Sequence, residues 1–259
     1  IWGVESRYGA RRGDIPVVSA TATLAFEGRR GAFFEANLID ALRIQQDGDV
    51  APAAMVGSWA GAMGHTQIIP STFRRIAVDF DGDGRRDIWS DDPTDALAAT
   101  ARFLRDAGWQ AGLPWGVEVT LPDTIDLRVA GRGNRRPTAA WRAAGLRGVR
   151  GASIPDLGAA ALLAPMGRGR PAFLVSANFD RLLRYNPAQN YGIAIGYLSD
   201  RLAGSPGLAG DFGPDRHGLR QQDRIALQRA LTRAGFDAGP PDGVLGRRTE
   251  AAIRAYQRR

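Results

Sequence analysis

Apolar residues recur at helical spacing through most of the first 110 residues, and this spacing predicts helices. Ile1, Val4, Glu5 and Tyr8 fall on one helical face, and Gly9 marks the expected end of that helix. The same periodicity predicts three further helices, at residues 33–45, 66–80 and 93–107.

The pattern changes after residue 115. Apolar and polar residues alternate over 116–129, which predicts short strands, and two more strand-like runs lie within 157–176. Helical spacing returns over 177–202. These segments predict a mainly α fold, a helical domain that carries a small β insertion.

The last part of the chain reads as a linker followed by a small helical domain. We expect a large first domain at 1–203, a Gly/Pro-rich linker at 204–218 and a small second domain at 219–259. In the second domain, Asp242 and the glycines are expected to fix a turn over a core of Leu227, Leu231, Ile253 and Tyr256. The first domain is expected to be truncated at its N-terminus and the second at its C-terminus.

Composition excludes several classes of site. The chain has no cysteine, so disulfides, Cys-ligated zinc and cysteine nucleophiles are excluded. Its net charge is +7, and all 34 basic residues are arginines. This excess favours an anionic partner such as the bacterial cell wall or a nucleic acid, whereas arginines scattered over solvated faces are the alternative interpretation. No basic helix motif supports nucleic acid, and no apolar run is long enough to span a bilayer.

Glu5 is the candidate acid, because it lies on the apolar face of the first predicted helix, near its C-terminal end. Burial and the negative end of the helix both disfavour a carboxylate, so both raise the pKa of Glu5. A carboxyl group that keeps its proton near neutral pH can act as a general acid. The alternative is a helix-end glutamate that points into water.

Residues 57–72 combine small and uncharged polar side chains. Small residues let a backbone approach a ligand closely, and Ser58 and Gln67 offer hydrogen bonds without charge. The segment therefore suits a neutral ligand rich in hydroxyl and amide groups, or else a tight contact between helices.

Three motifs together resemble the lytic murein transglycosylases of the B type. The first is Ile-Trp-Gly-Val-Glu-Ser-Arg-Tyr-Gly at 1–9, and the second is Gly-Ser-Trp-Ala-Gly-Ala-Met-Gly-His-Thr-Gln at 57–67. The third is Arg-Tyr-Asn at 184–186, followed by Tyr191. The resemblance covers residues 1 to about 202 and implies a lysozyme-like α+β fold. The segment at 219–259 similarly resembles a small peptidoglycan-binding domain.

The resemblance implies a reaction and a set of site residues. Glu5 would be the single acid and then base that cleaves the bond between N-acetylmuramic acid and N-acetylglucosamine, forming a 1,6-anhydro end without water. The residues that would line the sugar cleft are Ser58, Gln67, Tyr185, Asn186 and Tyr191, and Met63 would pack beside the site. Ile68 and Phe103 stand where the family often has an aromatic residue and a tyrosine, so altered subsite preference is expected.

Residues 79–90 follow the spacing of an EF-hand-like calcium loop. Asp79, Asp81, Asp83 and Asp87 supply oxygens, Gly84 sits at the sharp turn, and Arg85 offers its backbone carbonyl. Ser90 replaces the usual final glutamate. The related transglycosylases carry a longer loop, and Asp95 matches their last carboxylate, with Asp91 and Asp92 as the alternatives. A structural Ca²⁺ is expected here, with a merely hydrated Asp/Gly turn as the alternative, and no cofactor is expected to be required for catalysis.

The leading hypothesis is an exported lytic transglycosylase that binds peptidoglycan glycan strands through both domains. The alternatives are a muramidase that hydrolyses the same bond and a non-catalytic wall-binding protein. We expect a monomer, no nucleic-acid partner, and membrane attachment only through an upstream lipid anchor. The expected location is the periplasm, or the inner face of the outer membrane, of a Gram-negative bacterium.

Overall fold

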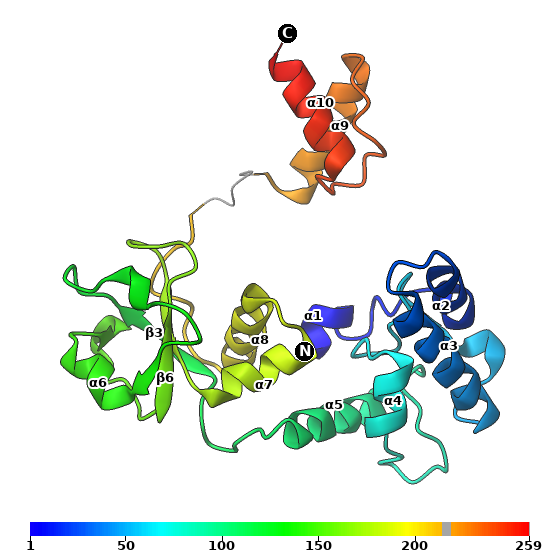
Figure 1. Cartoon of the computed structure of the whole chain (residues 1–259), viewed down its shortest axis with the longest axis horizontal. Helices are drawn as coiled ribbons and strands as arrows, with labels where there is room; N and C mark the ends of the chain where they lie inside the picture. Colours follow the sequence, from blue (N-terminus) through cyan, green and yellow to red (C-terminus); the bar gives the residue numbers. More distant parts are fainter. Residues whose placement is uncertain (214–218, 259) are drawn as a thin grey trace. The chain divides into compact units, whose positions relative to one another are not determined.

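The computed structural model describes residues 1–213 and 219–258. These residues form two compact units, Ile1–Leu163 with Ala172–Gly207, and Ala164–Pro171 with Leu208–Arg259 (Figure 1). Part of the expected linker, 214–218, lies outside the described residues. No helix in the described part of the chain has the length and apolar character needed to cross a bilayer.

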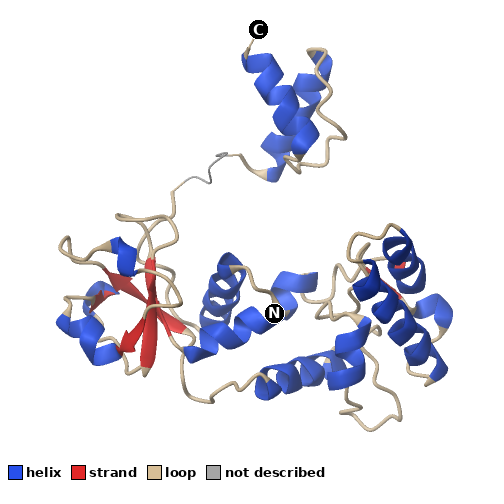
Figure 2. Ribbon diagram, in the orientation of Figure 1, coloured by secondary structure: helices blue, strands red, loops and turns tan. Residues whose placement is uncertain are grey.

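Helices dominate the described chain, and the strands are short (Figure 2). The α-helices are α1 Trp2–Ser6, α2 Val17–Phe26, α3 Gly31–Gln46, α4 Pro70–Ile76, α5 Thr94–Asp106, α6 Thr138–Ala143, α7 Ala177–Tyr185, α8 Gln189–Leu202, α9 Gln221–Arg233 and α10 Arg247–Gln257. The strands are β1 Ile15–Pro16, β2 Val56–Gly57, β3 Gly116–Thr120, β4 Arg135–Pro137, β5 Arg147–Gly148, β6 Ala159–Leu163 and β7 Ala172–Val175. The predicted mainly α fold with a small β insertion is therefore confirmed.

Helices α2, α3, α4 and α5 pack against one another in sequence order. Their shared core contains Ile44 from α3 and Phe73 from α4, together with Met55 and Met63 from the segments between the helices. All four side chains are almost completely buried. The two-stranded ladder β1–β2 pairs Ile15 with Gly57, which ties the segment after α1 to the glycine-rich segment.

The predicted helix at 66–80 is wrong at both ends. Gln67 has a left-handed backbone, with φ 54°, and Met63 forms an antiparallel bridge with Ile68, so the chain makes a tight turn before the helix begins. Helix α4 then starts at Pro70, whose fixed φ suits a first helical position. It ends at Ile76, because Ala77 is extended.

The β insertion is an antiparallel sheet with strand order β4-β6-β7-β3-β5. The two predicted strands within 157–176 are confirmed as β6 and β7. Of the strands predicted within 116–129, only β3 forms. Residues 127–129 make a 3₁₀ turn instead, because the Asp126 side chain accepts a hydrogen bond from the backbone N–H of Arg128 at 2.9 Å.

The sheet is anchored to the pair α7–α8. Trp115, just before β3, packs against Phe173 of β7 and Phe179 of α7, and its Nε1–H donates to Asp200 of α8 at 2.8 Å. A Cβ at Gly196 would lie 2.3 Å from the Trp115 ring, so α8 approaches the sheet closely only because this residue is glycine. Since α7 and α8 also carry Tyr185 and Tyr191, this packing fixes one wall of the site.

The C-terminal unit is built around α9 and α10. Leu231, Ala238 and Ala252 form its buried core, and Leu227 and Ile253 pack against them. Tyr256, which the sequence placed in this core, is 56% exposed and forms a T-shaped ring contact with Phe236.

The turn between these helices is held by a buried glutamine. Gln228 is 1% exposed. Its side chain accepts a hydrogen bond from the Gly243 N–H and donates to the Asp242 carboxylate. Asp242 also accepts from the Val244 N–H, so its expected role in the turn is confirmed.

Candidate functional site

Helix α1 carries Glu5 and is only five residues long. It ends where Arg7 and Tyr8 adopt left-handed backbone angles, with φ 52° and 57°. Val4 and Tyr8 are 42% and 47% exposed, so the apolar helical face expected from the sequence is not what buries the acid. Glu5 is nevertheless half-buried, and the contact made to it comes from α8.

The hydroxyl of Tyr191 donates a hydrogen bond of 2.6 Å to Oε1 of Glu5. Burial raises the pKa of Glu5 above its ordinary value, and the hydrogen bond from Tyr191 opposes part of this rise. Oε2 accepts no hydrogen bond from the described residues. The site therefore holds an acid that retains its proton to higher pH and keeps one oxygen free of hydrogen bonds from the described residues.

No second carboxylate of the described residues perturbs the pKa of Glu5. In the described part of the chain, no Asp or Glu contributes to the shift in the pKa of Glu5. Asp40 contacts Arg43 and Arg74 instead.

The glycine-rich segment packs backbone against backbone. A Cβ at Gly57 would lie 2.1 Å from the carbonyl oxygen of Ala62, and one at Gly64 would lie 2.2 Å from the carbonyl oxygen of Ile88. A Cβ at Gly13 would lie 2.2 Å from the carbonyl oxygen of Gly57. The small residues thus allow close crossings between non-helical segments, and not the contact between helices that was the alternative for this segment.

Three predicted cleft residues come from this segment. Ser58 is half-buried, and its Oγ accepts hydrogen bonds from the N–H groups of Ala60 and Ala62, at 3.3 and 3.1 Å. Met63 is completely buried in the helical core, so it supports the site from behind. Gln67 donates from Nε2 to the carbonyl oxygens of Arg12 and Gly64, both at 2.9 Å, which leaves its amide oxygen available to a ligand.

The other predicted cleft residues lie at the end of α7 and the start of α8. The Tyr185 hydroxyl donates to the carbonyl oxygen of Thr66, and its ring meets Phe103 edge-on at 5.0 Å. Helix α7 stops at Asn186, whose extended backbone is the conformation favoured before Pro187. The Asn186 side chain accepts from the N–H of Ala188 at 3.0 Å. The turn places Tyr191 on the next helix, facing Glu5.

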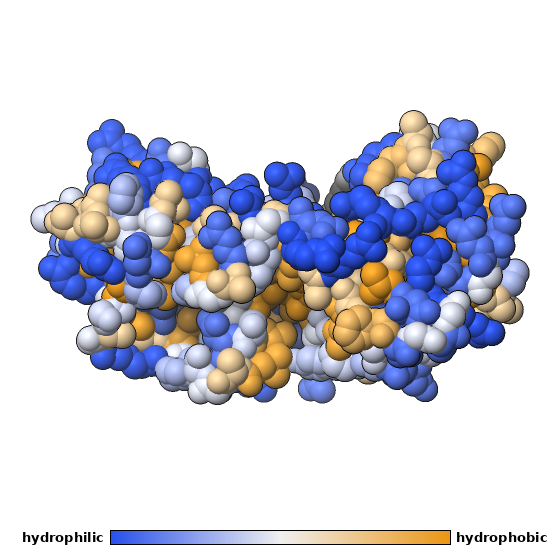
Figure 3. Space-filling model, turned by 90° about the horizontal axis from the view of Figure 1, so that it is seen from below, coloured by the Kyte–Doolittle hydropathy of each residue, from blue (hydrophilic) through white to orange (hydrophobic). Residues whose placement is uncertain are grey.

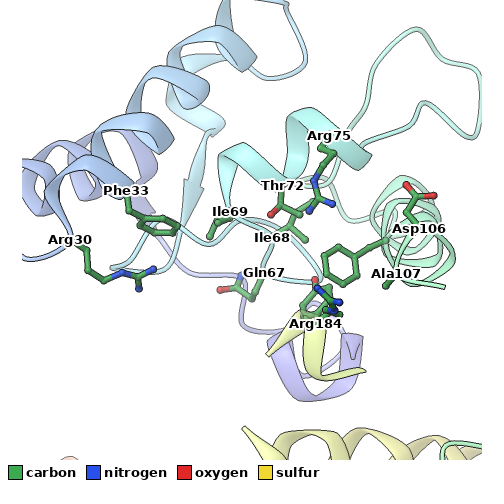
Figure 4. Close-up of a pocket in the computed structure, with 12 residues that line it drawn as sticks. Arg30, Phe33, Gln67, Ile68, Ile69, Thr72, Arg75, Asp106, Ala107 and Arg184 are labelled. Atoms are coloured by element: carbon green, nitrogen blue, oxygen red, sulfur yellow. The ribbon is translucent and has the colours of Figure 1, made fainter. Parts of the chain in front are cut away.

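A cavity of about 690 Å³ lies beside these residues (Figure 4). Gln67 and Tyr185 line it, and so do Ile68 and Phe103, the two positions that depart from the expected pattern. Arg30, Arg75 and Arg184 point into it from three different elements. Glu5 is not among its lining residues, so this cavity extends the site beyond the acid.

The sequence missed a buried network around His65. His65 is 2% exposed, and its Nδ1 accepts from the indole N–H of Trp2 at 3.1 Å. That bond leaves the proton on Nε2, which lies 2.8 Å from the carbonyl oxygen of Ser90. The carbonyl oxygen of His65 accepts from the hydroxyl of Ser6 at 2.5 Å. His65 therefore fixes α1 against the glycine-rich segment, and no spacing in the sequence signals this.

The Asp-rich loop gathers three of its predicted metal ligands. Carboxylate oxygens of Asp79, Asp81 and Asp83 lie within 4.8 Å of one another. A backbone hydrogen bond from Asp83 lowers the pKa of Asp81, but desolvation and repulsion by the neighbouring carboxylates raise it overall. This mutual repulsion is what a bound cation would relieve.

Asp95 closes the loop from the start of α5. It is 3% exposed, and its two oxygens accept from the N–H groups of Phe80 and Asp87, at 2.8 and 2.9 Å. Arg85 lies exposed in the same loop, and its N–H donates to Asp83 at 2.8 Å.

Many arginines lie on the surface and pair with nearby acids. Arg43, Arg128 and Arg254, for example, contact Asp40, Asp126 and Glu250. On the face shown in Figure 3, hydrophilic residues cover most of the rim and hydrophobic residues gather toward the middle. Many of the arginines are therefore scattered over the surface and paired with a nearby acid.

Comparison with known proteins decides the family. Residues 1–200 match the family model described as "Transglycosylase SLT domain", which is more than half of the chain. The chain belongs to this family. Residues 220–259 match a second model, "Putative peptidoglycan binding domain". The observed lysozyme-like α+β architecture agrees with this assignment.

Solved structures of relatives share this family. SltB3 from Pseudomonas aeruginosa, in complex with NAG-NAM-pentapeptide, is 48% identical, with a TM-score of 0.79 over 99% of this chain and 69% of that one. Escherichia coli Slt35, in complex with calcium, is 31% identical, with a TM-score of 0.67 over 78% of this chain and 64% of that one.

The membrane-bound lytic murein transglycosylase B of Escherichia coli strain K12 is 32% identical over 217 residues. The match covers 78% of this chain. The chain spans only 55% of that relative's length.

Proposed function

We propose that this protein is a lytic transglycosylase that cleaves the bond between N-acetylmuramic acid and N-acetylglucosamine in peptidoglycan. The observation that carries the proposal is the environment of Glu5. This acid is half-buried, has a raised pKa, accepts a hydrogen bond from Tyr191 and has no carboxylate partner in the described chain. The family and the peptidoglycan fragment bound by SltB3 support the substrate class.

In the proposed reaction, Glu5 gives its proton to the bridging oxygen as the bond from that oxygen to the muramic anomeric carbon breaks. The resulting carboxylate then takes the proton from the C6 hydroxyl of the same muramic residue. The C6 oxygen bonds to the anomeric carbon and closes a 1,6-anhydro ring, so no water is consumed. Intramolecular attack gains from a high effective molarity when the geometry is held.

A hydrolytic muramidase is the second candidate. Ordinary glycosidases use two carboxylates, at about 5–5.5 Å in retaining enzymes and about 6.5–9.5 Å in inverting ones. The absence of a second carboxylate that shifts the pKa of Glu5, within the described residues, favours the one-acid reaction. P. aeruginosa SltB3 has also been solved with NAG-anhNAM-pentapeptide, which carries the anhydro form.

Mass spectrometry of the muropeptides released from purified peptidoglycan tests the proposal. A transglycosylase releases fragments lighter by one water than the hydrolytic products, with no reducible end. Reducing muramic ends would make the protein a hydrolase. No release, together with intact binding to sacculi, would favour the non-catalytic wall-binding alternative.

The remaining predicted site residues are proposed to bind the sugar chain. Gln67 would use its amide oxygen, and Ser58, Asn186 and Tyr185 would present polar groups around Glu5, while Met63 would support them from the core. Tyr191 would act on the substrate through Glu5, as a positioning residue. Ile68 and Phe103 leave one side of the cavity apolar, which supports altered subsite preference.

We also propose that the Asp-rich loop binds a structural Ca²⁺. Asp79, Asp81 and Asp83 already face one another, Arg85 would contribute its carbonyl oxygen, and Asp95 would complete the loop. The calcium complex of the relative Slt35 supports this choice of ion. The bound ion would stabilise the loop. At the end of the loop, the carbonyl oxygen of Ser90 contacts Arg12 and His65. His65 in turn accepts a hydrogen bond from Trp2, in the helix that carries Glu5.

The segment 219–259 is proposed to hold the enzyme on its insoluble polymer by raising the effective concentration of substrate. The proposed division is therefore a catalytic domain at 1–203, a linker at 204–218 and a wall-binding domain at 219–259. We propose that the protein acts as a monomer on periplasmic peptidoglycan.

A further inference from the structure

A second cavity, of about 520 Å³, shares Arg184 with the cavity beside Tyr185. Three arginines line it: Arg181 and Arg184 come from α7, and Arg132 comes from the segment before β4. Asp180 is the only acid among its lining residues. Because Arg184 lines both cavities, a ligand in the second one would lie next to the site that contains Tyr185.

The single acid does not neutralise these three arginines. Asp180 is already paired with Arg135, whose Nη2 lies 2.5 Å from its Oδ2. Arg135 is further held by the carbonyl oxygen of Ala159, at 2.7 Å. Arg132 reaches Asp180 only at 3.4 Å and stays 44% exposed, so its guanidinium remains available to another anion.

Arg181 lines the cavity without a carboxylate partner in the described part of the chain. Its Nε is buried and has no hydrogen-bond partner, and no ion pair joins Arg181 to the described residues. Arg184, one helical turn later on α7, is likewise without an ion pair among the described residues. An anion that enters this cavity would therefore meet Arg181 and Arg184, two guanidinium groups that no carboxylate of the described residues neutralises.

We propose that this arginine pocket, formed by Arg132, Arg181 and Arg184, binds a carboxylate of the stem peptide attached to the muramic residue. The inference rests on the proposed function, because it assigns a second part of the same substrate. A stem peptide begins at the muramic residue and carries free carboxylates, and guanidinium groups pair with carboxylates in two-pronged geometry. The pocket would make the enzyme prefer glycan strands that carry peptides.

Binding measurements test the proposal without requiring turnover. Isothermal titration of the Glu5→Gln variant compares NAG-NAM-pentapeptide with the NAG-NAM disaccharide. The peptide-bearing ligand is expected to bind about tenfold or more tightly, with a difference that shrinks at high salt. Arg132→Ala and Arg181→Gln, each added to Glu5→Gln, are expected to remove most of this difference.

Arg128→Ala is the matched control, because it removes an equal charge from an arginine that is 91% exposed and pairs with Asp126 in its own turn. The peptide preference should survive that change. The pocket is overturned if the Arg132→Ala variant keeps the same preference for the peptide-bearing ligand as its Glu5→Gln parent. It is also overturned if the Glu5→Gln parent binds neither ligand. If Arg181→Gln fails to fold, the binding measured for Arg132→Ala, at an exposed position, still tests the pocket.

The two proposals fail separately. A chain that releases no anhydro products but keeps an arginine-dependent peptide preference would refute the transglycosylase reaction and leave the pocket standing. Release of anhydro products, together with equal affinity for the two ligands, would refute the pocket and leave the transglycosylase reaction standing.

Discussion

The hydroxyl of Tyr191 lies 2.6 Å from Oε1 of Glu5, although 186 positions separate the two residues in the sequence. The contact joins α8, which is locked to the β insertion through Gly196 and Trp115, to the short helix α1. It orients the candidate acid and limits the rise in its pKa. Both effects can be measured in the Tyr191→Phe variant, which lacks only the hydroxyl oxygen.

Tyr191→Phe is expected to lower kcat by about tenfold to a hundredfold. A hydrogen bond to a charged group is worth about 1.5–3 kcal/mol, and about 1.4 kcal/mol corresponds to tenfold in rate. The pKa of Glu5 should rise further without this bond, so the alkaline limb of the kcat–pH profile should move to higher pH. A uniform fall in kcat with an unmoved limb would show that Tyr191 does not tune the acid.

Glu5→Gln is expected to lower activity by at least about a hundredfold, the low end of general acid–base contributions. It should also remove a pH dependence of stability. The pKa of Glu5 is raised in the folded state, so the native protein gives up this proton less readily than the unfolded chain. The free energy of unfolding should therefore fall as pH rises from about 4.5, the ordinary glutamate value, through the raised value.

Thermal unfolding at pH 4 and pH 7 checks this sign. The variant should gain in Tm relative to the wild type on going from pH 4 to pH 7. A constant difference between the two proteins would mean that Glu5 does not keep its proton in the folded state.

Calcium is expected to raise the Tm. A ligand that binds only the folded state at 100 times its Kd adds about 2.7 kcal/mol. Asp81→Asn should weaken this response, because it removes a charge from the carboxylate cluster, whereas Asp123→Asn, at an exposed acid after β3, should not. Identical melting curves in calcium and in chelator would eliminate the site.

Gly196→Ala is expected to destabilise the protein by about 1–3 kcal/mol, the usual cost of overpacking. The new Cβ would lie 2.3 Å from the Trp115 ring. In an exposed helix the same change stabilises by about 1 kcal/mol, so the sign of the shift in Tm is diagnostic. Ala194→Ser, at an exposed position of the same helix, is the control.

Gln228→Ala is expected to destabilise the C-terminal unit by about 1–3 kcal/mol, because it leaves the buried N–H of Gly243 unpaired. Limited proteolysis of the full chain should show faster cleavage within 219–259. Gln222→Ala, at an exposed position on α9, should leave the cleavage rate unchanged, and equal rates for both variants would contradict the role of Gln228.

Parts of the candidate site could be predicted from the sequence because their motifs are local. The Asp-rich loop closes on itself within a few residues, as when the Asp79 carboxylate accepts from the N–H groups of Gly82 and Gly84, so its spacing predicted the cluster. The two short strand-like runs within 157–176 likewise predicted β6 and β7. These features depend on neighbours in the chain.

Other features were hidden because their causes lie far away in the sequence. The helix predicted to begin at residue 66 is delayed to Pro70 by the bridge between Met63 and Ile68. Helix α2 escaped prediction because β-branched residues such as Val18 and Thr23 have weak helix propensity.

The sequence by itself determined the mainly α fold, the candidate acid Glu5 and the segments that carry the remaining site residues. Only the tertiary structure decided that Tyr191 donates to Glu5, that His65 braces α1, and that Arg132 joins Arg181 in one pocket. Spacing along a chain fixes contacts within an element. Contacts between elements depend on packing, such as the close approach of α8 to Trp115, which no local pattern specifies.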